Sequence, residues 1–253
     1  MALLTGRKGT MTPRDELIFK TLFFCRYLTS RQIARMFFGS EGRTRARLLD
    51  LEAKNYLDHR VFYLAQPTEK AMSGKQSVWH LTKDGYEAVT ASLGLDEPHA
   101  SKQLLQENVQ HYVLANDVYV AARDMLDEEL GPYPEWEWRH EKRVLYVGEY
   151  ENELYVHNPD AHVVFRDHVF MLERQTEASK VGPKAIYKKV RNRKLYASLR
   201  LRKPAEILFA LDGSASPMAG TVERAGEQYG IRVVTGDVRG IADYLYSSAA
   251  RLS

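Results

Sequence analysis

The spacing of apolar and polar residues changes several times within the first 95 positions. Apolar residues recur at helical spacing after Thr12-Pro13, a cap residue followed by a proline suited to the first helical turn. A second helix is predicted over 31–38, and the turn GSEG leads to a third helix over 43–54 that ends at Asn55. Two strand-like stretches and a fourth helix complete the pattern, the strands at 56–65 and 77–81. Three helices followed by a two-stranded ribbon predict a winged helix-turn-helix over residues 12–94.

The remaining pattern predicts a long helix and then an alternation of strands and helices. Residues 95–134 are predicted to be a linker and a long connecting helix, whose apolar residues lie on more than one side. After residue 135, strands are predicted at 136–147, 162–165, 169–173, 205–211 and 231–234, and helices at 184–199, 218–229 and 240–249. We therefore expect an α+β chain that ends in an α/β sandwich over residues 135–253.

Composition excludes several classes of protein. The chain contains one cysteine, so neither an intramolecular disulfide nor a cysteine-based zinc site can form. No apolar run is long enough for a signal peptide or a membrane span, so we expect a cytoplasmic protein with no membrane partner. The net charge is only +3, but residues 180–203 contain ten basic and no acidic side chains. Such a cluster favours nucleic acid as the partner, although a solvated helix face would have the same composition.

The third predicted helix carries the strongest candidates for DNA contact. Four residues at its N-terminal end are expected to enter the major groove, where arginine can bind guanine or phosphate. Other basic residues of the second helix, the ribbon loop and the C-terminal segment are expected to contact the DNA backbone. The full candidate set is Arg31, Arg35, Arg43, Thr44, Arg45, Arg47, Lys70, Lys75, Lys184, Lys188 and Arg191. The alternative is a protein-binding winged helix with a solvated basic rim.

Double-stranded DNA is therefore the expected partner. Binding should require no cofactor and no small molecule. We also expect a homodimer, because such domains usually bind paired half-sites and because the long helix is apolar on two sides.

A second candidate site lies in the segment HNPDAHVVFRDHVFMLERQ. Pro159-Asp160 precedes one apolar strand, Glu173 ends the next, and Gln175 follows two residues later. This arrangement resembles the restriction-endonuclease-like superfamily. The resemblance implies that Asp160, Glu173 and the carbonyl of Arg174 hold Mg²⁺ or Mn²⁺, while a lysine stabilises the attacking water or the phosphate.

Gln175 occupies the position of that lysine and cannot supply its positive charge. Some members of the superfamily carry the lysine on the following helix, which makes Lys180, Lys184 or Lys188 a possible replacement. The catalytic candidates are Asp160, Glu173, Gln175 and Lys188. The sequence leaves open whether this domain cleaves DNA or only binds it.

The whole chain resembles the replication-relaxation family of plasmids and integrated mobile elements. The similar segments are TSRQIARMFF, RARLLDLEAKNYL, VWHLTKDGYEAV, HYVLANDVYVA, PDAHVVFRDHVFMLERQTEA and KAIYKKVRNRKLYA. The resemblance implies a role in plasmid replication or its control. The alternatives are a metal-dependent DNA endonuclease or nickase targeted by the winged helix, and a transcription regulator.

Overall fold

The structure, a computed structural model, describes residues 11–64, 74–95, 106–130, 136–175, 181–211 and 217–252. The chain is of mixed α and β structure, as expected, and divides into two compact units. The described residues up to Val113 belong to the first unit and those from Leu114 onward to the second, so helix α5 (Gln106–Leu130) contributes to both. Among the described helices, none combines the length and the apolar character that crossing a membrane requires.

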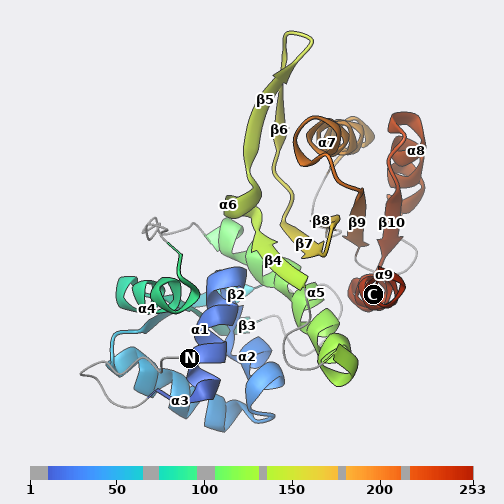
Figure 1. Ribbon diagram of the computed structural model, residues 1–253. Helices are drawn as coiled ribbons and strands as arrows, with labels where there is room; N and C mark the ends of the chain where they lie inside the picture. The colour runs from blue at the N-terminus through green and yellow to red at the C-terminus, as the bar shows by residue number, and fades with distance from the viewer. Residues whose placement is uncertain are drawn as a thin grey trace. The chain divides into compact units, whose positions relative to one another are not determined.

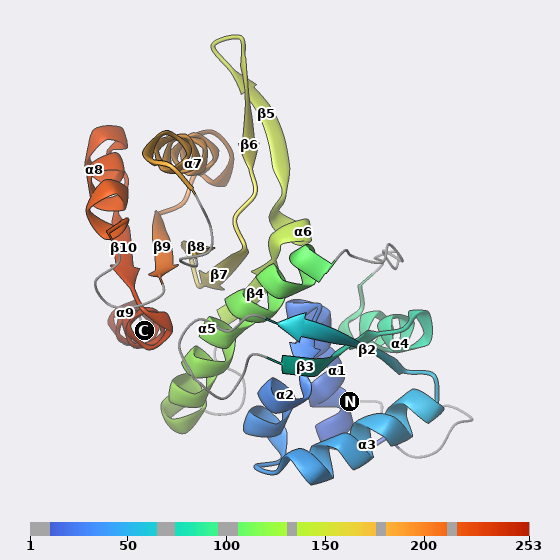
Figure 2. The ribbon, with the colours of Figure 1, turned by 180° about the vertical axis from the view of Figure 1, so that it is seen from behind.

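The first unit contains four helices and a three-stranded sheet among its described residues before α5. Figure 2 shows helices α1 to α4 and strands β2 and β3. Strand β3 lies between β1 and β2 and is antiparallel to both. The elements are α1 (Pro13–Cys25), β1 (Leu28–Thr29), α2 (Ser30–Phe37), α3 (Glu41–Ala53), β2 (Leu57–Leu64), β3 (Gly74–Leu81) and α4 (Lys83–Leu93).

Local sequence signals explain where these helices begin and end. Thr12 caps α1 through a reciprocal capping box with Asp15, and Thr29 caps α2 in the same way with Gln32. After α3, Asn55 takes the left-handed conformation with φ 61°, which directs the chain into β2. At Gly85 in α4, an added Cβ would lie 2.1 Å from the carbonyl oxygen of Tyr56, so only glycine permits this approach.

The second unit is built on a five-stranded sheet in the order β10-β9-β8-β7-β4. Strands β8, β9 and β10 are parallel, whereas β7 is antiparallel to both of its neighbours. The elements after α5 are β4 (Trp136–His140), α6 (Glu141–Val144), β5 (Tyr146–Tyr150), β6 (Glu153–His157), β7 (Ala161–Phe165), β8 (His168–Gln175), α7 (Pro183–Tyr196), a π-helical turn (Ala197–Leu201), β9 (Ala205–Leu211), α8 (Ala219–Tyr229), β10 (Val233–Gly236) and α9 (Val238–Leu252).

Alternate residues of the central strands face different helices. Met171 of β8 and Phe209 of β9 are fully buried in a core with Ile186 and Val190 of α7 and with Val222 of α8. The next residues along the strands point to the opposite face, where the ring of Phe170 contacts Tyr244 of α9. Figure 1 shows α7 and α8 on one side of this sheet and α9 on the other. Glu173 and Gln175 therefore share the face of Met171, toward α7.

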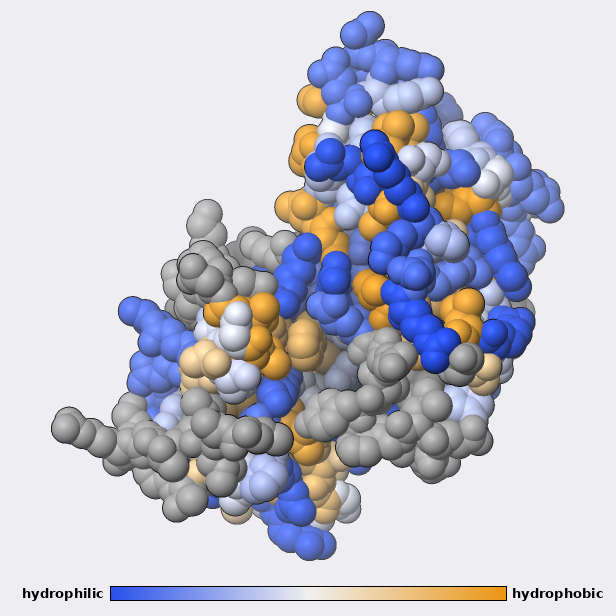
Figure 3. All heavy atoms as spheres, viewed as in Figure 1, coloured by the Kyte–Doolittle hydropathy of each residue, from blue (hydrophilic) through white to orange (hydrophobic). Residues whose placement is uncertain are grey.

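The prediction of one continuous strand over 136–147 is wrong, because two strands, β4 and β5, occur there with α6 between them. His140 ends β4, and the short helix α6 follows, with the backbone N–H of Glu141 donating to the carbonyl of Asp160 at 3.0 Å. Strand β5 then pairs with β6 in a hairpin that the sequence pattern did not predict. Its turn residues Glu151 and Asn152 both have positive φ. A Glu-Asn pair is not a typical signal for such a turn. The hairpin exposes apolar side chains, among them Val147 and Leu154, and Figure 3 shows apolar residues along its edge.

Candidate functional site

Residues of α2, α3 and the β2–β3 hairpin line a hollow of about 670 Å³ in the first unit. Three predicted DNA-binding residues, one from each of these parts, come together there: Arg31, Arg45 and Lys75. Among the described residues that line the hollow, Glu41 is the one acidic side chain, so positive charge is in excess among them. We call this the basic hollow; its lining is Thr29, Ser30, Arg31, Glu41, Gly42, Arg45, Val61, Gly74, Lys75, Gln76 and Ser77.

Further exposed cations lie on the elements that line the basic hollow. Arg43 precedes Arg45 by two residues on α3, and both side chains are exposed. Arg35 is exposed on α2, one turn beyond Arg31. On the hairpin, the ammonium of Lys75 lies 5.6 Å from the ring centre of Tyr63, a side chain that is 62% exposed. The surface therefore offers several charged donors to a polyanion.

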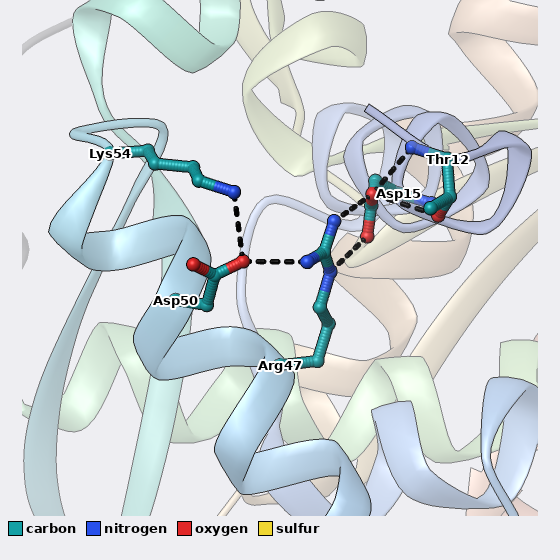
Figure 4. A network of polar contacts seen from close by, with 5 residues as sticks. All are labelled: Thr12, Asp15, Arg47, Asp50 and Lys54. Atoms are coloured by element: carbon teal, nitrogen blue, oxygen red, sulfur yellow. Dashed lines mark hydrogen bonds and ion pairs between the residues drawn. The ribbon is translucent and has the colours of Figure 1, made fainter. Parts of the chain in front are cut away.

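Two of the predicted contact residues in α3 have other roles, which Figure 4 shows for Arg47. Thr44 is completely buried, and its hydroxyl donates to the carbonyl of Ser40 at 2.7 Å. The guanidinium of Arg47 donates to the buried carboxylate of Asp15 at 2.8 Å and to Asp50 at 2.6 Å. The prediction that Thr44 faces DNA is wrong because its side chain is interior. Arg47 joins α3 to α1, and its contact with DNA stays a prediction.

Electrostatics support this structural role of Arg47. Burial would raise the pKa of Asp15, but hydrogen bonds from Arg47 and Thr12 outweigh it and lower that pKa. The pKa of Arg47 is raised in turn, first by its hydrogen bond to Asp15. Lys70, another predicted contact, lies outside the described residues.

A second cluster, in the second unit, brings together the two predicted carboxylates and helix α7. The Asp160 carboxylate accepts a hydrogen bond of 2.5 Å from the backbone N–H of Arg174, next to Glu173. Glu173 is 1% exposed, and its two oxygens accept from Lys189 at 2.8 Å and from Arg193 at 2.7 Å. We call Asp160, Glu173, Lys189 and Arg193 the acidic site.

The two carboxyl groups of the acidic site differ in their protonation. Burial, reinforced by the charge of Glu173, raises the pKa of Asp160 to about 7. Burial acts in the same direction on Glu173, but the charges of Arg193 and Lys189 outweigh it and lower the pKa of that group. Glu173 is therefore the anion of the pair, and Asp160 exchanges a proton near neutral pH.

The lysine of the acidic site is not the one that we predicted. Lys188 is exposed and lines a different hollow, whereas the next residue, Lys189, reaches Glu173. A rotation of about 100° per residue around the helix separates the two side chains. Gln175 is buried at the end of β8, and Lys180 lies outside the described residues. The sequence contained a usable signal: Lys189 and Arg193 are four residues apart, beside the apolar Ile186 and Val190.

The acidic site as arranged does not fit a divalent cation. Each oxygen of the Glu173 carboxylate already accepts a hydrogen bond from a cationic side chain. One oxygen of Asp160 accepts a hydrogen bond from the backbone N–H of Arg174. Magnesium and manganese prefer several oxygen ligands, and no group of three histidine, cysteine or acidic residues in the described part of the chain could hold a metal. A metal would have to displace Lys189 or Arg193.

The other predicted residues of α7 form a separate set. Lys184, Lys188 and Arg191 line a hollow of about 760 Å³ together with residues of β6 and α8. The predicted DNA contacts thus line one hollow in the first unit and another in the second unit.

Comparison with known proteins gives one family match. The family described as replication-relaxation matches residues 19–209. No curated protein matches the chain in sequence. Two solved structures are similar. Protein VC1899 from Vibrio cholerae has 12% sequence identity and a TM-score of 0.36, and the match covers 93% of this chain. The restriction endonuclease FokI has 8% sequence identity and a TM-score of 0.28, and the match covers 97% of this chain. The chain spans 50% and 46% of the lengths of those two proteins.

Proposed function

The chain belongs to the replication-relaxation family, and from this premise we propose that it binds double-stranded DNA in the replication of a plasmid or mobile element, or in its control. The observation that carries the proposal is the basic hollow, where α2, α3 and the β2–β3 hairpin each contribute a cation. In this proposal the first unit is a winged helix-turn-helix, with α3 entering the major groove and the hairpin acting as the wing.

The roles of individual residues follow from their exposure. Arg43 and Arg45 lie at the exposed N-terminal part of α3, where arginines of such helices meet base edges or phosphates. Arg31 and Lys75, which line the basic hollow with Arg45, contact the DNA backbone in this proposal. Arg47 stabilises the position of α3, because its hydrogen bond to Asp15 fixes α3 to the first turn of α1.

Replacing Arg43 and Arg45 together by alanine is expected to weaken duplex binding about tenfold or more at moderate salt, because two phosphate-neutralising charges are lost. The slope of log affinity against log salt should fall by about 2 in magnitude for the same reason. Fluorescence anisotropy with a labelled duplex measures both quantities.

The matched control replaces Lys54 and Lys83, two cations of the same unit that lie outside the basic hollow. This variant carries the same change in net charge but should retain affinity within about threefold. Equal losses in both variants would mean that the whole unit attracts DNA only through its overall charge. An unchanged affinity of the Arg43→Ala/Arg45→Ala variant would contradict the proposal.

A second candidate function is metal-dependent cleavage of DNA by a restriction-endonuclease-like second unit. One observation favours it, namely that Lys189 reaches Glu173 from the helix after β8, in the way that the sequence resemblance allows. The pairing of Glu173 with two cations opposes it. Incubation with supercoiled plasmid and Mn²⁺ tests this function: nicking that disappears in both Asp160→Ala and Lys189→Ala would support it, and nicking that survives both would exclude the acidic site as its source.

Pairing of two copies, which we predict from the usual binding of such domains to half-sites, extends the proposal. Analytical ultracentrifugation of the chain with and without duplex DNA would measure it. A monomer in both samples would contradict this part of the proposal without affecting the role of the basic hollow.

A further inference from the structure

Helix α7 carries cations on two faces, and the acidic site uses only one of them. Lys189 and Arg193 pair with Glu173, whereas Lys184, Lys188 and Arg191 follow one another at spacings of four and three residues along another face. Within the described part of the chain, Lys184 and Lys188 form no ion pair. Arg191 contacts Glu153 at 2.8 Å, a surface pair whose two side chains are 35% and 65% exposed.

This second face lines a hollow of about 760 Å³, which we call the α7 groove. Two aromatic side chains lie beside the cations: Tyr187 on α7 and Tyr229 at the end of α8, with ring centres 6.4 Å apart and planes inclined by 71°. Both rings are half-buried, so each is held against the core while it still has an accessible part. The described residues that line it are Glu153, Leu154, Pro183, Lys184, Tyr187, Lys188, Arg191 and Tyr229.

The polarity of α7 adds to the positive potential of the groove. The helix begins at Pro183, and its N-cap residue Gly182 provides no side-chain acceptor for the first backbone N–H groups. The positive end of the helix dipole and the ammonium of Lys184 therefore lie at the same end of the groove.

We propose that the α7 groove binds single-stranded DNA, with its cations on the phosphates and its two tyrosines in contact with the bases. The inference deepens the proposed DNA-binding function and rests on it for the class of ligand. A single strand is favoured over a duplex because unpaired bases expose their ring faces, which aromatic side chains can stack upon, whereas a duplex presents mainly phosphates to such a groove. Cations next to aromatic rings in a concave surface are the usual arrangement of sites that bind single strands.

The Lys184→Ala/Lys188→Ala variant is expected to bind labelled oligo(dT) about tenfold or more weakly than the wild type, since two phosphate contacts are lost. Its affinity for a duplex should stay within about threefold of wild type. The charge-matched control is Arg202→Ala/Lys203→Ala, which removes two exposed cations that do not line the groove. This control should bind oligo(dT) like the wild type.

A third variant, Glu153→Gln, is expected to act in the opposite direction. It removes the one acidic side chain among the described residues that line the groove and releases Arg191, so oligo(dT) should bind more tightly. A gain of affinity does not result from misfolding, which keeps the test valid even if the double lysine variant is unstable.

Stacking is tested on the wild-type protein with an oligonucleotide that keeps its phosphates but lacks its bases. Binding should weaken about tenfold or more relative to oligo(dT) if the tyrosines contact bases. Equal affinity for the abasic and normal strands would overturn the single-strand assignment, as would tighter binding of oligo(rU) than of oligo(dT).

The two DNA-binding proposals fail separately. Loss of duplex binding in Arg43→Ala/Arg45→Ala with oligo(dT) binding retained supports both assignments. A Lys184→Ala/Lys188→Ala variant that loses duplex and single-strand binding equally would overturn the inference about the groove and leave the basic hollow in place. Failure of the wild type to bind a duplex, with oligo(dT) binding intact, would contradict the proposed function alone.

Discussion

Replacing Glu173 by glutamine is expected to lower the free energy of unfolding by about 3 kcal/mol or more, because a buried anion that two cations share is lost. Glu173 is 1% exposed and Arg193 is 3% exposed on its side chain, so solvent cannot take over the missing contact. A neutral amide leaves the guanidinium of Arg193 in the interior without its anion. Lys189 loses less electrostatic stabilisation than Arg193 in this variant, since it also interacts with Asp160. Denaturant unfolding followed by far-UV circular dichroism measures the change.

Glu153→Gln is the matched control for this prediction. It makes the same chemical change and also removes the partner of an α7 cation, Arg191, but on the surface. Exposed ion pairs contribute about 1 kcal/mol or less, so this variant should unfold almost like the wild type. If the two variants were equally stable, Glu173 would not be the buried partner of α7 that the structure describes.

The sequence predicted the first unit well because its signals are local. Thr12-Pro13 and Asn55 mark helix ends through the backbone contacts of their own neighbours, and the four predicted helices and two predicted strands occur there in that order. The two-residue strand β1, which adds a third strand to the sheet, was not predicted. Contacts between distant residues were not predictable in this way. The pair Asp15–Arg47 spans 32 positions, and neither the capping pattern of α1 nor the charge of α3 indicates that the two residues meet.

The second unit was predicted less completely for a similar reason. The mixed α and β class and the family are confirmed. The β5–β6 hairpin was missed because its turn is Glu-Asn and because the tryptophans and the later apolar residues between Trp136 and Val147 resemble one long strand despite the charged residues between them. In the acidic site, the motif identified Asp160 and Glu173, but the choice between Lys188 and Lys189 depends on how α7 is rotated against the sheet. That rotation is fixed by core packing of Ile186 and Val190.

Acid should destabilise the chain through His157 and His162, a buried pair beside the acidic site. Their Nε2 atoms lie 2.8 Å apart, so one ring donates to the other, and the ring of His157 also stacks on Tyr196 at 3.6 Å. Burial, followed by the positive charge of Arg193, lowers the pKa of both groups, that of His162 to about 3. Both histidines are therefore neutral in the folded protein throughout the mildly acidic range.

The direction of the pH effect follows from the protons that each state binds. Below the unfolded pKa of about 6.5, the unfolded chain takes up a proton on each histidine and the folded chain does not, so stability falls as the pH falls. At about 1.4 kcal/mol per histidine per pH unit, the pair should contribute a loss of about 4 kcal/mol between about pH 7.5 and pH 5. Asp160 acts in the opposite direction, because its raised folded pKa of about 7 makes the folded state bind a proton first.

A His157→Phe/His162→Leu variant separates these opposing contributions. It keeps a ring to stack on Tyr196 and an apolar group in β7, and it is expected to become more stable as the pH falls from about 7.5 to 5, because the contribution of Asp160 remains. The wild type should become less stable over the same range, and so should the control His111→Gln, which changes an exposed histidine of α5. Denaturant unfolding at several pH values gives the slopes, and parallel curves for the wild type and the double variant would show that the two histidines are not held neutral by the fold.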